Sequence, residues 1–214
     1  MNEVALLHTR IISAGLISCV FARKPGIWRG IARLVEDEPV RWVARASSQA
    51  RAGDGNRAGD GLDGLSWDAL CQSMAAAHSG NAEAHLAPLL RYERAAPEDT
   101  SAGIYLWFLL RYRVAELLGR RPGREDLQAV AERYYPQFAK LIRGDKSQFE
   151  DTLLTVFSLA PEDRKVKGGD AVVMGSAALG VLLDDPEAEL AAMRPHLAEW
   201  WQANAHEFRE LGAG

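Results

Sequence analysis

From residue 66 to residue 212, apolar residues recur at every third or fourth position, the spacing of one face of an α-helix. The pattern predicts an all-α bundle of six or seven helices joined by short connections. We expect these helices at Ser66 to Gly80, Asn81 through Tyr92, Ile104 to Leu118, 124–143, Asp145 through Phe157, 169–184, and Asp185 through Leu211.

The predicted helix boundaries carry residues that are typical of helix ends. Ser66, Asn81 and Asp145 are placed to cap helix N-termini with their side chains, and Gly80 and Gly119 are placed to end helices. Four pairs of adjacent acids could suggest acid/base chemistry. Because acidic residues also stabilise the first turn of a helix, and prolines accompany three of the pairs, we interpret them as capping residues. The pairs are Glu98–Asp99, Glu125–Asp126, Glu162–Asp163 and Asp184–Asp185.

Residues 1–65 follow a different pattern. Residues 1–45 combine short β-favouring runs with one amphipathic helical stripe at 27–35, which indicates a small N-terminal appendage of mixed α/β character. Residues 46–65 are rich in Gly and Asp and contain Arg-Ala-Gly-Asp-Gly twice, which is typical of a flexible linker. The predicted organisation is therefore a basic segment at 1–45, a linker at 46–65 and a helical domain at 66–212.

The charge of the chain is unevenly distributed. The formal net charge is −4, but residues 1–57 carry nine Arg or Lys and five acids, whereas residues 58–214 carry 16 and 24. An anionic partner would therefore meet the N-terminal segment, and the acidic remainder is a poor candidate for binding nucleic acid. The segment mixes basic side chains with an aromatic one, as phosphate contacts and base stacking require. The candidate nucleic-acid-binding residues are Arg23, Lys24, Trp28, Arg29 and Arg33.

Composition bears on the cellular compartment. Cys19 and Cys71 are the two cysteines of the chain, too few for a disulfide framework, which favours a reducing cytoplasm. The uncharged runs Ile11–Ala22 and Ala171–Leu183 are shorter than the roughly 18–20 apolar residues of a membrane-spanning helix. Before the first run, Arg10 alone supplies positive charge and Glu3 stands where a secretion signal carries basic residues, so we do not expect secretion. Twenty Arg against five Lys suggests a GC-rich coding sequence and, with it, a bacterial source.

Two features of the helical domain are candidates for an interaction surface. Small residues inside a helix lower its propensity, so Gly175, Ser176 and Gly180 predict close packing against another helix or a second subunit. The adjacent Trp200 and Trp201 would anchor a partner if one of them were exposed. For both features, packing within the chain is the interpretation that we favour over an interaction surface.

The sequence contains no recognisable catalytic signature. No two histidines have the spacing of a zinc protease motif, and neither cysteine nor any serine lies in a known nucleophile motif. We therefore expect no metal and no cofactor. An enzyme would need a cleft between helices, near Pro88, Pro136 or Pro195, and the polar residues available to such a cleft include His78, His85, Tyr134 and Asp170.

These observations favour a non-catalytic, cytoplasmic protein-interaction or regulatory module, with a protein partner or self-association as its mode of action. Two alternatives remain: nucleic-acid binding through the basic N-terminal arm, and an enzyme with an interhelical cleft of unrecognised type.

Overall fold

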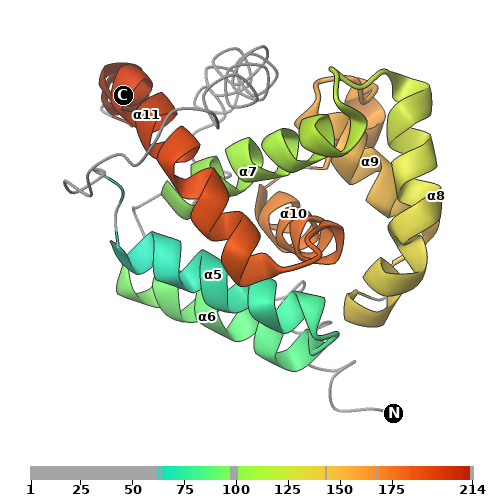
Figure 1. Cartoon of the computed structure of the whole chain (residues 1–214), viewed down its shortest axis with the longest axis horizontal. Helices are drawn as coiled ribbons and strands as arrows, with labels where there is room; N and C mark the ends of the chain where they lie inside the picture. The colour runs from blue at the N-terminus through green and yellow to red at the C-terminus, as the bar shows by residue number, and fades with distance from the viewer. Residues whose placement is uncertain (1–61, 63, 97–100, 143, 167, 213–214) are drawn as a thin grey trace.

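The computed structural model describes residue 62 and residues 64–96, 101–142, 144–166 and 168–212. This part of the chain is all-α, as the periodicity predicts, and contains seven α-helices, one 3-10 turn and no strand (Figure 1). The elements are α5 (Gly64–His78), α6 (Ala82–Ala95), α7 (Ser101–Leu118), α8 (Arg124–Leu141), α9 (Lys146–Val156), η1 (Glu162–Arg164), α10 (Gly168–Leu182) and α11 (Pro186–Gly212). The predicted appendage at 1–45 and nearly all of the predicted linker lie outside the described residues.

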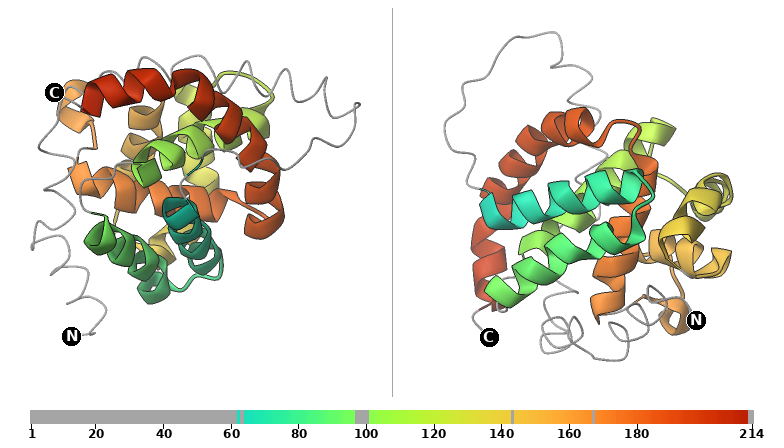
Figure 2. Two further views of the ribbon diagram at one scale, coloured as in Figure 1. Left: turned by 90° about the vertical axis from the view of Figure 1, so that its left-hand side faces the viewer. Right: turned by 90° about the horizontal axis from the view of Figure 1, so that it is seen from below.

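The helices surround α10. Helices α5 and α6 form one helical hairpin and α8 and α9 form another, and α10 lies between the two hairpins (Figure 1). Helix α7 passes on a further side of α10, and α11 packs across α5 and α7 (Figures 1 and 2). Helix α10 is thereby in contact with α5, α7, α8 and α9.

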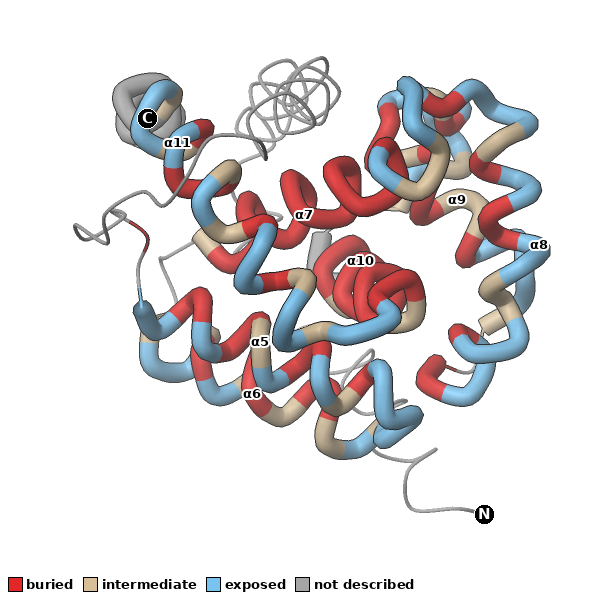
Figure 3. The backbone as a smooth tube through the Cα atoms, viewed as in Figure 1, coloured by how far each residue is buried: buried red, intermediate tan, exposed pale blue. Residues whose placement is uncertain are grey.

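The sequence of α10 explains its central position. From Ala171 to Leu182 it carries no charged residue, and a helix that is apolar on every face is stable in water only when neighbours cover it. Ala177, Ala178 and Leu179 are fully buried, and the tube of α10 is buried along most of its length (Figure 3). The core of the bundle is built around this helix.

Three of the predicted helix ends have the expected contacts. Gly80, with φ of 73°, ends α5, and the Asn81 side chain then accepts a hydrogen bond from the Ala84 N–H at 3.0 Å. Asp145 and Gln148 form a reciprocal capping box at the start of α9, with bonds of 2.9 and 3.2 Å. These local sequence signals therefore identified the helix boundaries correctly.

The predicted cap at Ser66 is wrong. Helix α5 begins two residues earlier, at Gly64, and Ser66 lies inside its first turn with a fully buried side chain. Ser66 belongs to the same buried face as Trp67 and Leu70. Packing of this face against the bundle extends the helix beyond the position that a capping side chain would have marked.

Prolines inside helices do not end them. Pro88, Pro136 and Pro195 each lie within a continuous helix. Pro195 is exposed on α11, and Figure 2 shows this long helix curving around the edge of the bundle. Proline is a common cause of helix bending because it removes a backbone hydrogen bond. The curvature lets α11 follow the surface formed by α5 and α7.

Ser158 closes α9 in a conformation that favours glycine. Its φ is 58°, and the backbone bonds from Ser158 to Thr155 and from Leu159 to Leu154 repeat the pattern that Gly80 makes at the end of α5. A side chain at positive φ is strained, and the Ser158 side chain is exposed, so burial does not compensate for the strain.

We predict that Ser158→Gly raises the free energy of unfolding by about 0.5–1 kcal/mol, because it removes the strain at positive φ. The reverse change, Gly80→Ser, is the matched control. It should lower stability by a similar amount, since a Cβ at Gly80 meets no atom within 4 Å and only the backbone conformation differs. Urea denaturation of both variants measures the effect, and a destabilised Ser158→Gly protein would contradict it.

Candidate functional site

A cluster of buried polar side chains lies where α6 meets α5 and α10. His85 belongs to the first turn of α6 and shares its buried face with Leu86, Leu89 and Tyr92, so the fold of the helix points the imidazole inward. The ring is fully buried between Ser73 of α5 and Ser176 of α10, both of which are also fully buried. Three helices thus contribute one polar side chain each to the same point.

Hydrogen-bond contacts link the three side chains. Ser176 Oγ donates to the Val173 carbonyl at 2.9 Å, and its oxygen lies 3.2 Å from His85 Nε2. The other ring nitrogen, Nδ1, lies 3.1 Å from Ser73 Oγ and 3.3 Å from the Ser73 carbonyl oxygen. A chain of polar contacts therefore runs from α5 through α6 to α10.

A serine and a histidine at hydrogen-bond distance resemble the pairing of a nucleophile with its general base. Here Ser73, His85 and Ser176 are all fully buried. The arrangement satisfies buried polar groups and joins three helices, which is a structural role.

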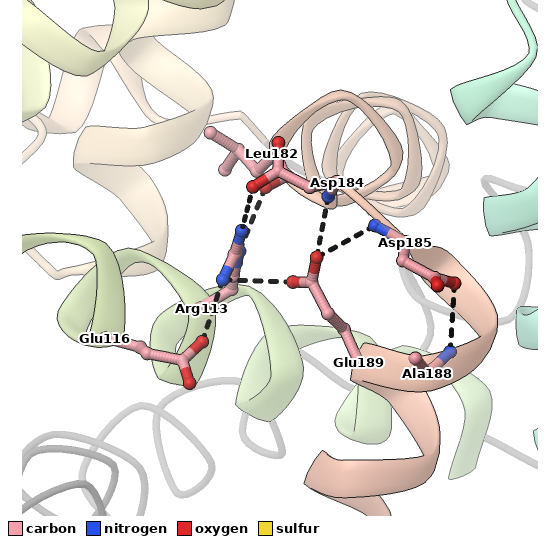
Figure 4. A network of polar contacts seen from close by, with 7 residues as sticks. All are labelled: Arg113, Glu116, Leu182, Asp184, Asp185, Ala188 and Glu189. Carbon is pink, nitrogen blue, oxygen red and sulfur yellow. Dashed lines mark hydrogen bonds and ion pairs between the residues drawn. The ribbon is translucent and has the colours of Figure 1, made fainter.

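A second polar centre is formed by Arg113, which lies in the largely buried helix α7. Its Nε donates to the Leu182 carbonyl at 2.9 Å, at the C-terminus of α10 (Figure 4). Its two terminal nitrogens lie 2.9 Å from a Glu116 oxygen, 3.0 Å from a Glu189 oxygen and 3.2 Å from an Asp184 oxygen. The Arg113 side chain is 9% exposed, so these partners compensate for the loss of its hydration.

Glu189 connects this arginine to the backbone of the α10–α11 connection. Its other carboxylate oxygen accepts from the N–H groups of Asp184 and Asp185 at 2.7 and 2.9 Å (Figure 4). Asp185 in turn caps α11 by accepting from the Ala188 N–H at 3.1 Å. Arg113 and Glu189 therefore determine where α10 ends and where α11 begins.

Sequence reasoning did not identify Ser73, Arg113 or Glu189 as important. A signal for Arg113 does exist, because two arginines, Arg111 and Arg113, interrupt the apolar helix at 104–118. A charged residue in a buried helix requires a partner. Which acids supply it is not visible in the sequence, since Asp184 lies 71 positions further along the chain.

The two tryptophans of α11 pack inside the chain. Trp200 is fully buried, with its ring centroid 5.0 Å from that of Phe108. Trp201 is partly buried and meets Tyr105 edge-on at 5.1 Å. The condition for a partner anchor, exposure on the surface, is therefore not met by Trp200, which lies in the core. Both rings hold α11 against α7.

The small residues of α10 also pack within the chain. A Cβ added at Gly180 would lie 2.3 Å from the Ala77 Cβ, and one added at Gly175 would lie 3.4 Å from Leu106. Ser176 is bonded to His85. The close approach predicted from these residues is therefore present, but it brings α10 against α5, α6 and α7. Of the two kinds of close packing that these residues predict, the structure contains the one within the chain.

The residues proposed for an interhelical cleft are found in dissimilar environments. His78 is exposed at the end of α5, and Asp170 is exposed in the first turn of α10. Tyr134 is partly buried on α8, with the Arg133 guanidinium 5.2 Å from its ring centroid. His85 is in the core. The pair that the structure does bring together is His85 with Ser176.

The remaining sequence predictions concern nucleic acid, metals and membranes. Arg23, Lys24, Trp28, Arg29 and Arg33 lie outside the described residues. Within the described ranges, no group of three or more His, Cys, Asp or Glu side chains is placed to hold a metal ion. None of the helices described is long and apolar enough to cross a membrane.

Comparison with protein-family models, with curated proteins and with solved structures finds no match to this chain.

The Gly180 contact generates a prediction. Gly180→Ala should lower the free energy of unfolding by about 1–3 kcal/mol, because the added methyl overlaps Ala77. Gly175→Ala is the matched control on the same helix. Its methyl has ordinary contact with Leu106, so the gain in helix propensity should leave stability unchanged or slightly raised. Equal effects of the two substitutions in urea denaturation would contradict the close α5–α10 approach.

The hydrogen-bond chain generates a second prediction. Ser176→Ala should cost about 1–3 kcal/mol of stability, because His85 Nε2 loses its hydrogen-bond partner in a buried site. Ser79→Ala, which removes an exposed hydroxyl bonded to the Ala76 carbonyl, should change stability by less than about 0.5 kcal/mol. Thermal or chemical unfolding measures the stabilities of the two variants. A Ser176→Ala variant as stable as the wild type would show that the cluster contributes no stability.

His196 of α11 generates a pH prediction. Its ring stacks on Tyr112 at 5.4 Å, and burial lowers the pKa of His196 from 6.5, although Glu199 and Glu116 act in the opposite direction. The folded protein therefore resists protonation of this ring more than the unfolded chain does. The contribution of His196 to the free energy of unfolding is therefore fully present above about pH 6.5, and it is lost as the pH falls.

In the test, His196→Phe keeps an aromatic ring on Tyr112 but cannot be protonated. Between pH 7.5 and pH 5.5, the free energy of unfolding of the wild type should decrease more than that of the variant. Parallel pH profiles for the two proteins would show that His196 is as easily protonated in the fold as in the unfolded chain.

Proposed function

We propose that this chain is a non-catalytic helical module that acts by binding a protein partner or a second copy of itself. The observation that carries the proposal is that side chains capable of catalysis are instead buried and bonded between helices. His85, Ser73 and Ser176 are fully buried and in hydrogen-bond contact with one another across three helices through the His85 ring. Such a pair holds the bundle together and leaves its outward helix faces to make contacts.

The Arg113 centre supports the same proposal. Its acidic partners orient the start of α11, so this helix is held in a defined position on the bundle. A partner recognises a surface more tightly when the elements that form it are already fixed, because less conformational entropy is lost on binding. The proposed site of action is therefore the exterior of the helical bundle. We place the protein in a bacterial cytoplasm, for which the cysteine content and the Arg-to-Lys ratio are the support.

Charge asymmetry favours one further candidate function. Residues 1–57 carry a net charge of +4, whereas residues 58–214 carry −8. Nucleic-acid binding through Arg23, Lys24, Trp28, Arg29 and Arg33 would have an affinity that falls steeply with salt. It would also be lost on deletion of residues 1–57. The interaction proposal instead assigns binding to the helical domain, which that deletion retains.

The first test is native mass spectrometry of the full chain purified gently from its own host. We expect a stoichiometric complex with a protein partner or a second copy. Hydrogen exchange on that complex should then show protection of outward helix faces within residues 64–212. As a matched pair, Ser176→Ala should bind as the wild type does once folded, because its effect is internal, whereas a charge reversal on a protected face should weaken binding.

Two results would overturn the proposal. One is a retained small molecule that the protein converts, with conversion abolished by a substitution in the helical domain that leaves the protein folded. The other is a bare monomer whose binding in a salt-dependent assay is confined to nucleic acid. The second result would move the function to the N-terminal arm.

A further inference from the structure

We draw no further inference here: the strongest candidate, the outward face of α11 beside the acidic α10–α11 corner, is a stripe of small exposed residues (Ala188, Ala191 and Ala192) next to a group of carboxylates, and nothing in the described part of the chain shows what covers it.

Discussion

The burial of α10 is the constraint on which the other helices depend. Between Ala171 and Leu182 the side chains of this helix are apolar or small, and Ser176 carries the single hydroxyl. Every face of the helix is therefore stable only when other helices bury it. Two hairpins and α7 provide that cover, and α11 packs across α5 and α7. The glycines on α10 set how closely the neighbours approach, and Gly180 leaves room for little more than the Ala77 methyl.

Two polar centres act on this apolar helix at different points. Ser176 on its side bonds to His85, and the Leu182 carbonyl near its end accepts from Arg113. Apolar packing tolerates small rotations and shifts of a helix, whereas a buried polar group without its partner costs free energy. The two centres therefore favour a single rotation and a single position of α10 among those that hydrophobic contact would allow.

The side chains of these two centres resemble those of a catalytic or binding site. Within the helical domain, a histidine between two hydroxyls and an arginine among three carboxylates are both satisfied by partners within the chain. All of these partners except Glu116 lie on a different helix or connection, so each residue acts on the arrangement of the bundle. This is the physical basis for seeking the function of the protein on its exterior.

The sequence by itself determined the helical class of residues 64–212 and most helix ends, because helical periodicity and capping act within a few residues of the backbone they stabilise. Asn81, Asp145 and Asp185 cap the helices that their positions predicted. Ser66 did not, since packing of its buried face extended α5 to Gly64. The tertiary structure alone decided that α10 is central and that Trp200 and Gly180 face inward. It also decided that His85 contacts Ser176 and that Arg113 contacts Asp184. Such contacts join residues about 70 to 100 positions apart. The choice among competing partners follows from how whole helices pack, which a local sequence pattern does not report.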